Sequence, residues 1–175
     1  MQMTDTRQIA ATPSEVYAAL LDPGMLKACV PGAQDVIGSP EEGYEATVVQ
    51  KVGPVKATFK GQVTMSDLVP DQFLNITGEG KGGAAGFAKG GAKVTLVAKD
   101  GGTELSYDVE AKVGGKLAQL GSRIIDGFAK KMADQFFNNL QETLEGPADG
   151  EGDAGENAGG DAPEKKKGWF GRSKK

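Results

Sequence analysis

Apolar and polar residues alternate over residues 103–113, and this pattern limits the fold more than any other feature of the sequence. Successive side chains of a β-strand point to opposite faces of the sheet. One of the two sets is apolar throughout and consists of Leu105, Tyr107, Val109, Ala111 and Val113. The segment therefore predicts a strand in an antiparallel sheet that has one buried face and one solvated face.

Four further segments show the same alternation in part and also predict strands: residues 45–52, 55–69, 73–80 and 91–99. The breaks between strand segments include turn-forming pairs such as Gly53-Pro54 and Pro70-Asp71. Connections this short join antiparallel neighbours, because a parallel pair needs a crossover of about a dozen residues or more. We therefore expect a run of antiparallel strands from residue 33 to residue 113.

Helices are predicted on both sides of this run. After a first strand over residues 2–9, Thr12, Pro13 and Glu15 have the spacing of a helix N-cap with its capping box. A second short helix is expected over about 23–28. Residues 116–144 predict a long amphipathic helix, whose apolar arc contains Leu117, Gly121, Ile124, Ile125, Phe128, Met132 and Phe136. The order of elements indicates an α+β domain over residues 1–145.

The last thirty residues differ from the rest. Residues 146–163 are acidic and glycine-rich and contain no aromatic or branched apolar side chain, so we predict a disordered linker. Residues 164–175 form a basic aromatic tail, and its predicted membrane-binding residues are Lys165, Lys166, Lys167, Trp169, Phe170, Arg172, Lys174 and Lys175. Cations attract anionic lipid and Trp favours the headgroup region. The alternatives are a solubilising end, a nucleic-acid-binding tail or a docking peptide for a partner protein.

The composition argues against several kinds of site. The chain has no histidine and one cysteine, Cys29, which excludes histidine-based triads and imidazole metal ligands. The glycines of 78–83 match a dinucleotide-binding pattern, but strands are predicted on both sides where a helix should follow. Residues 1–145 have no basic excess for binding nucleic acid. We predict no catalytic or metal-binding residues, and a cytoplasmic location because no signal peptide or spanning segment is present.

Small residues on the long helix and on the glycine-rich strands leave space between them. This pattern predicts a pocket for a lipophilic ligand, bounded by Leu117, Leu120, Gly121, Ile124 and Phe128, with Phe87 near its mouth. Phe87 is either a core plug or a gate. The alternative is that Leu, Phe and Met side chains close the space completely.

Several stretches carry a resemblance to a known family: Leu21-Asp22-Pro23, residues 26–32, Val52-Gly53-Pro54-Val55, residues 78–91, residues 103–107 and residues 114–123. Through them the chain resembles the family of the G subunit of carbon monoxide dehydrogenase, within the START-like, polyketide cyclase-like superfamily of helix-grip domains. The resemblance implies a curved antiparallel sheet wrapped around a long C-terminal helix, with an internal apolar cavity.

It further implies a non-catalytic accessory protein of a molybdenum-containing CO dehydrogenase-type enzyme. Such a protein is associated with the inner face of the cell membrane, and a quinone is a suitable bound ligand. Two alternatives stay open: a small cyclase-like enzyme acting on a hydrophobic substrate, and a docking protein with a filled core. Convergent polar side chains in the cavity would favour the enzyme, and a dry apolar lining would favour the carrier.

Overall fold

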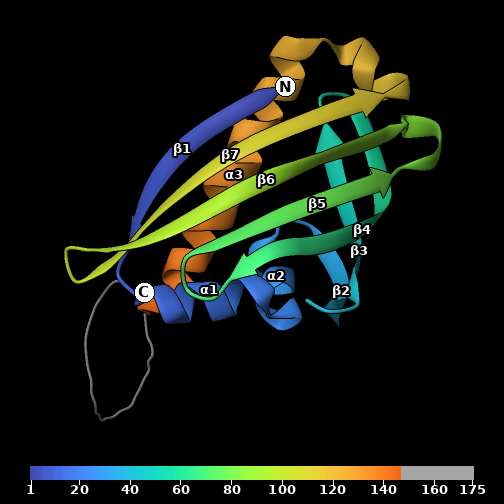
Figure 1. Ribbon diagram of the computed structural model, residues 1–175. Coiled ribbons are helices and arrows are strands. Elements are labelled where there is room, and N and C mark those ends of the chain that lie inside the picture. Colours follow the sequence, from blue (N-terminus) through green and yellow to red (C-terminus); the bar gives the residue numbers. More distant parts are fainter. Residues whose placement is uncertain (147–175) are drawn as a thin grey trace, which may run out of the picture. The chain divides into compact units, whose positions relative to one another are not determined.

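One antiparallel sheet is the framework of the protein. The computed structural model describes residues 1–146. Within them, seven strands pair in the order β1-β7-β6-β5-β4-β3-β2. Their bounds are β1 Gln2–Ile9, β2 Ala33–Ser39, β3 Gly43–Val52, β4 Val55–Val69, β5 Phe73–Lys81, β6 Phe87–Lys99 and β7 Gly102–Gly114. The sheet curves around one long helix (Figure 1), which confirms the expected α+β architecture and matches a helix-grip fold.

The helices are α1 Pro13–Leu21, α2 Pro23–Cys29, the 3₁₀ helices η1 Gly83–Ala85 and η2 Gly115–Leu120, and α3 Ser122–Glu145. The predicted capping box of α1 is present. The backbone N–H of Glu15 donates to Oγ1 of Thr12 over 3.1 Å, and the backbone N–H of Thr12 donates to Oε1 of Glu15 over 2.9 Å. These bonds satisfy two backbone donors at the start of the helix.

The long helix begins later than the sequence predicts. A continuous helix from residue 116 was expected, but residues 115–120 form η2 and α3 begins at Ser122. Gly121 joins them with a φ of +88°, a left-handed conformation that no α-helix contains. Helical periodicity does not reveal such a break, because residues on either side of it can still fall on one apolar arc.

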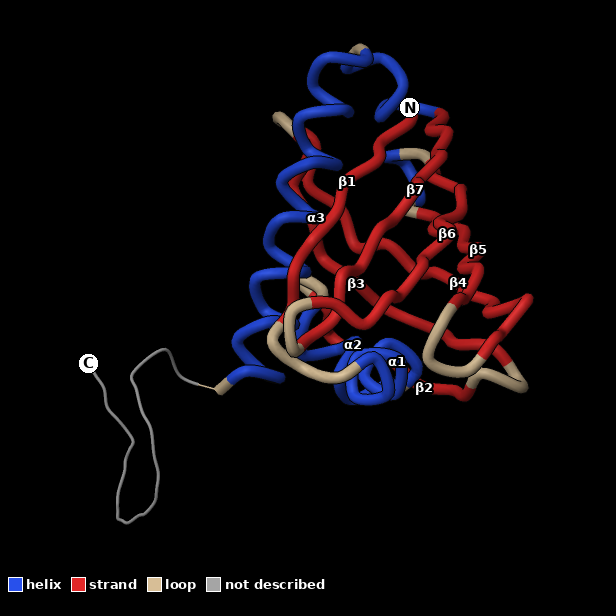
Figure 2. The backbone as a smooth tube through the Cα atoms, turned by 60° about the vertical axis from the view of Figure 1, so that its left-hand side comes forward, coloured by secondary structure: helices blue, strands red, loops and turns tan. Residues whose placement is uncertain are grey.

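The sheet has two distinct ends. The β3–β4 turn, η1, η2 and the first turn of α3 lie at one end, which we call the η1/η2 end. The other hairpin turns lie with α1 and α2 at the opposite end, the α1/α2 end, as Figure 2 shows for the two helices. The antiparallel topology fixes this separation, since each strand reverses the direction of the one before it.

The core lies towards the α1/α2 end, between the sheet and the C-terminal half of α3. Leu105, Leu140 and Val16 are fully buried there. The ring of Phe137 on α3 stacks on Tyr107 of β7, with centroids 5.0 Å apart. Burial of this kind contributes about 1.5–3 kcal/mol for each large apolar side chain. The predicted inward face of β7 is therefore confirmed.

An ion pair also joins α3 to the sheet. The guanidinium of Arg7 on β1 bonds Asp134 on α3 and lies over the ring of Phe137, 5.2 Å from its centroid. Lys130 donates to the same carboxylate over 3.2 Å. Hydrogen bonds from Lys130 and Arg7 hold the pKa of Asp134 below its usual range.

Asp134→Asn is expected to reduce the dependence of stability on acidic pH. Because the folded-state pKa of Asp134 is lowered, its stabilising contribution is complete above about pH 4 and is lost as the pH falls through the folded-state pKa. Melting temperatures measured between acid and neutral pH should therefore show a smaller loss of stability at acid pH for this variant than for the wild type. Asp126→Asn on the same helix is the control, and an equal change in both variants would contradict the assignment.

Candidate functional site

An apolar pocket lies between the sheet and the first half of α3, towards the η1/η2 end. Its volume is about 370 Å³. Strands β1, β3, β4, β5, β6 and β7 contribute to it together with η2 and α3. The lining residues are Met1, Met3, Val48, Gln50, Val52, Phe59, Gly80, Ala88, Val109, Ala111, Val113, Leu117, Ile125, Phe128, Ala129 and Met132.

Small residues in register across the sheet account for this space. Gly80 of β5 pairs with Gly61 of β4 on one side and with Ala88 of β6 on the other. No side chain longer than a methyl group projects from these three neighbouring positions. A Cβ on Gly80 would have Cβ of Phe59, at 3.9 Å, as its nearest neighbour outside the adjacent residues. The inner face of the sheet therefore carries no large side chains at these positions, near the start of α3, whereas Leu105 and Tyr107 fill the space further along the sheet.

The lining is almost entirely hydrocarbon and thioether. Among the described residues that line the pocket, Gln50 has the only polar side chain, and its amide Nε2 already donates to the carbonyl oxygen of Pro31. No pair of acidic or basic side chains faces the space. Such a lining can hold an apolar ligand by burial but offers no group for proton transfer or nucleophilic attack.

The structure brings together two of the six predicted ligand-binding residues. Leu117 on η2 and Phe128 on α3 both line the pocket. The side chains of Leu120 and Ile124 lie beside the β3–β4 turn, where a Cβ on Gly53 would be 3.9 Å and 3.7 Å from them. Leu120 and Ile124 are not part of the lining, so their predicted contact with a ligand stays a prediction.

Gly121 and Phe87 lie elsewhere than expected. Gly121 connects η2 to α3 and is absent from the pocket lining. Phe87 is 38% exposed, and the next residue of β6, Ala88, lines the pocket. Because neighbouring side chains of a strand point to opposite faces, Phe87 lies on the outer face, where its ring covers Gly114 of β7. It is therefore neither a core plug nor a gate at this pocket.

The sequence did not indicate the contribution of β3 and β4 to the pocket. Val48, Val52 and Phe59 supply much of the sheet side of the pocket. The sequence did hold a signal for them, because each belongs to the alternate residues of its strand that face inward. That set could be chosen only after the pairing of the strands was known.

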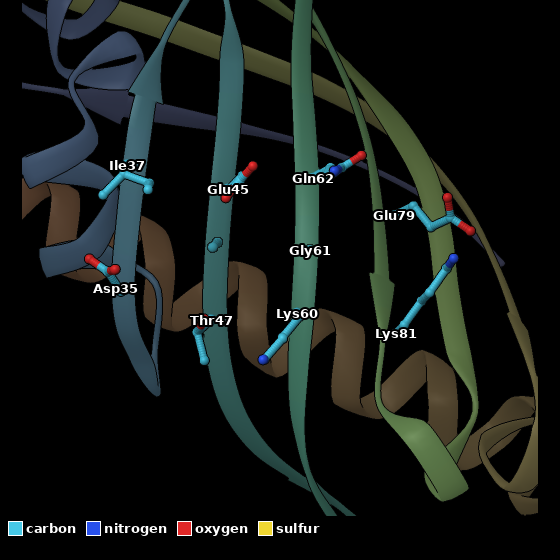
Figure 3. A pocket seen from close by; sticks show the side chains of 10 residues that line it. Asp35, Ile37, Glu45, Thr47, Lys60, Gly61, Gln62, Glu79 and Lys81 are labelled. Carbon is cyan, nitrogen blue, oxygen red and sulfur yellow. The ribbon is translucent and has the colours of Figure 1, made fainter.

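A second pocket lies on the outer face of the sheet, turned away from α3 (Figure 3). Its volume is about 440 Å³, and its charged residues are Asp35, Glu45, Lys60, Glu79 and Lys81. All five are exposed to solvent. Charges in this setting keep their hydration, so the arrangement has no desolvated group of the kind that catalysis uses.

No reactive centre is evident in the part of the chain that the structure describes. Cys29 is fully buried, and burial raises the pKa of its thiol, which disfavours the nucleophilic thiolate. Burial also raises the pKa of Tyr44, with smaller effects of Glu41 and Asp22, and its hydroxyl donates to the carbonyl oxygen of Leu21 over 2.5 Å. No three His, Cys, Asp or Glu side chains within residues 1–146 gather closely enough to hold a metal ion.

The predicted membrane contact belongs to the tail of the chain. None of the helices within residues 1–146 has both the length and the hydropathy to cross a bilayer. The predicted linker beyond Gly146 and the predicted membrane-binding tail, residues 164–175, lie outside the described residues.

Comparisons with solved structures support the fold. A conserved protein from Geobacillus kaustophilus is 27% identical, with 83% of this chain and 95% of that chain covered and a TM-score of 0.77. A protein from Chromobacterium violaceum is 22% identical over 83% of this chain and 98% of that chain, with a TM-score of 0.62. One from Thermus thermophilus is 13% identical over 83% and 97%, also with a TM-score of 0.62.

A comparison with curated proteins finds no match. The model of the CoxG family, which describes the G subunit of carbon monoxide dehydrogenase, matches residues 6–145. These residues include the end of β1, all of β2 to β7, and α3. They form the sheet, the helix and nearly all of the apolar pocket between them. The chain therefore belongs to the CoxG family, the family of the G subunit of carbon monoxide dehydrogenase.

Proposed function

We propose that the protein is a non-catalytic accessory protein of a molybdenum CO dehydrogenase-type enzyme and carries a lipophilic, quinone-like ligand. Family membership suggests the accessory role. The apolar pocket of about 370 Å³ is the observation that carries the ligand proposal. This volume is within the usual range of small-molecule sites, roughly 300–1,000 Å³. A substituted quinone ring and the start of its apolar chain suit a lining of this kind.

The alternatives find less support in the same pocket. A cyclase-like enzyme needs polar groups that polarise or deprotonate its substrate, and the lining offers only Gln50, whose amide is bonded to Pro31. A docking protein without a ligand needs a filled core. Here a pocket remains where Gly80, Ala88 and Ala129 replace larger side chains.

Membrane attachment completes the proposal. Residues 164–175 combine six cations with Trp169 and Phe170. Charge attraction together with apolar insertion supplies the two signals that stable but reversible anchoring requires. Through this tail the protein would hold its ligand, and its partner enzyme, at the cytoplasmic face of the cell membrane.

The ligand proposal is tested on the full-length protein purified without detergent. We expect native mass spectrometry to detect a bound lipophile, and organic extraction to release a molecule with the absorbance of a quinone. An added long-chain quinone should also bind to stripped protein in a one-to-one ratio. A protein that is empty after purification and does not take up quinone would contradict the proposal.

The tail is expected to bind anionic vesicles through both of its signals. Trp169→Ala with Phe170→Ala removes insertion, so binding should weaken and become more sensitive to salt. Lys165, Lys166 and Lys167 replaced by Gln should weaken binding to anionic vesicles and leave weak binding to neutral vesicles nearly unchanged. Co-sedimentation of the full chain measures both effects. Unchanged sedimentation of both variants would rule out the tail as an anchor.

A further inference from the structure

The η1/η2 end of the domain is strongly basic. β1 and β2 also begin at this end, and their first six residues contribute Asp5, Arg7 and Asp35. The rest of this end consists of the six nearest residues of each strand from β3 to β7, together with η1, η2 and the first six residues of α3. Within residues 1–146, this region holds three carboxylates, Glu79, Glu110 and Asp126, and eight cations. The eight cations, which we call the basic surface, are Lys51, Lys56, Lys60, Lys81, Lys89, Lys112, Lys116 and Arg123.

The opposite end has the reverse charge. The β2–β3 turn carries Glu41 and Glu42, the β4–β5 turn carries Asp71, and the β6–β7 turn carries Asp100. Asp22 lies there too, between α1 and α2. The acidic composition of the whole chain therefore conceals a separation of charge along the sheet.

The basic surface is free to act on a partner. All eight side chains are exposed. Among the residues that the structure describes, the ion pairs involve Arg7, Lys99 and Lys130, and none involves a member of the basic surface. Strand register places Lys60 beside Lys81, and Lys89 between Lys112 and Glu79, so positive charges outnumber negative ones across these strands.

Apolar side chains and the pocket lie at the same end. Phe87 is 38% exposed and pairs with Lys81 in register, and Ile124 on the first turns of α3 is 42% exposed. The pocket begins directly beneath this end, where Val52, Val113 and Leu117 line it.

We propose that the η1/η2 end of the folded domain docks on an anionic bilayer surface and presents the pocket to the lipid. This contact is separate from the tail anchor of residues 164–175. The cations would face anionic headgroups, with Phe87 and Ile124 at the level of the interface. The acidic α1/α2 end would be repelled, which orients the domain. The choice of a bilayer over an acidic protein rests on the proposed lipophilic ligand, whose source is the membrane.

The test uses the full chain in a background in which the tail is silenced: Lys165, Lys166, Lys167, Arg172, Lys174 and Lys175 replaced by Gln, and Trp169 and Phe170 by Ala. Vesicles contain equal parts of phosphatidylserine and phosphatidylcholine and no quinone, so binding does not depend on the ligand. We expect residual, salt-sensitive co-sedimentation. Lys89→Gln, Lys112→Gln and Lys116→Gln together should reduce it at least about tenfold, because three cations at up to about 1 kcal/mol each contribute up to roughly 150-fold.

The matched control neutralises three exposed lysines outside the basic surface, Lys27, Lys93 and Lys131, and changes the net charge equally. It should keep the binding of the background. Equal losses in the two triple variants, or no loss in either, would overturn the proposal. Failure of the tail proposal appears separately, as equal binding of the wild-type and tail-silenced chains.

A second readout reports orientation. In the tail-silenced chain the only tryptophan, Trp169, is gone, so Ile124→Trp introduces a single fluorophore at the basic end. Its emission should shift to the blue on addition of anionic vesicles. Val97→Trp, which is near the β6–β7 turn and replaces a side chain that is 51% exposed, should not respond. A response at residue 97 alone, or vesicle binding with no response at residue 124, would also overturn the proposal.

Discussion

Gly80→Leu is expected to weaken binding of a long-chain quinone about a hundredfold while leaving the protein folded. Gly80 lies in the pocket lining, and a Cβ there meets only Phe59, at an ordinary contact distance of 3.9 Å. The longer side chain then extends into space that the ligand needs. Overfilling a packed site costs up to about 3 kcal/mol, which corresponds to roughly a hundredfold increase in Kd. Quinone titration of the stripped protein measures the effect.

Two variants make this result interpretable. Thr58→Leu adds a similar side chain to the exposed face of β4 and should leave the Kd unchanged. Gly80→Ala adds a single methyl group and should have an intermediate effect. A Gly80→Leu protein that has a normal melting temperature and binds quinone as tightly as the wild type would show that the ligand site is not this pocket.

Gly121, which the sequence placed at the boundary of the pocket, is not a suitable position for this test. Its φ of +88° strains any side chain, and the residue does not line the space. A loss of binding in a Gly121 variant would reflect a disturbed start of α3. Gly80 avoids both problems, because it lies within a regular strand and faces the pocket.

Most of the strands could be predicted from the sequence, because the alternation of apolar and polar residues also shows which side chains face the core. In 103–113 one set is apolar and the other polar, so the inward face of Leu105 and Tyr107 was identified without any tertiary information. The strand β2 was not recognised as a separate strand within residues 33–113, because Gln34, Asp35 and Gly38 interrupt the alternation of apolar and polar residues. Edge strands pair on one side and need less apolar content.

The glycine-rich stretch shows where sequence reasoning stops. In β6 the small residues Ala88 and Ala92 lie on the inward set, whereas the large Phe87 lies on the outward set. A preference for burying the largest side chain predicts the opposite. The pairing with β5 and β7 decides the matter, and register depends on contacts between strands that no single segment encodes.

Two glycines of this stretch have different roles, although the sequence presents them alike. Gly80 leaves open space beside Phe59. Gly90 is in close contact with the neighbouring strand: a Cβ there would overlap the carbonyl oxygen of Glu110 and lie 2.8 Å from Cα of Ala111. Absence of a side chain thus provides volume at one position and close approach of two backbones at the other.

Gly90→Ala is therefore expected to destabilise the fold by about 3 kcal/mol, since β6 and β7 must move apart to admit the methyl group. For a domain of this size the melting temperature should fall by roughly 6–12 °C. Gly80→Ala, the same substitution in the adjacent strand, should change it little, because its Cβ has room. Thermal unfolding followed by circular dichroism compares the two variants. Equal melting temperatures would mean that β6 and β7 are not as closely paired at Gly90 as described, and the register that places Ala88 in the pocket would then need revision.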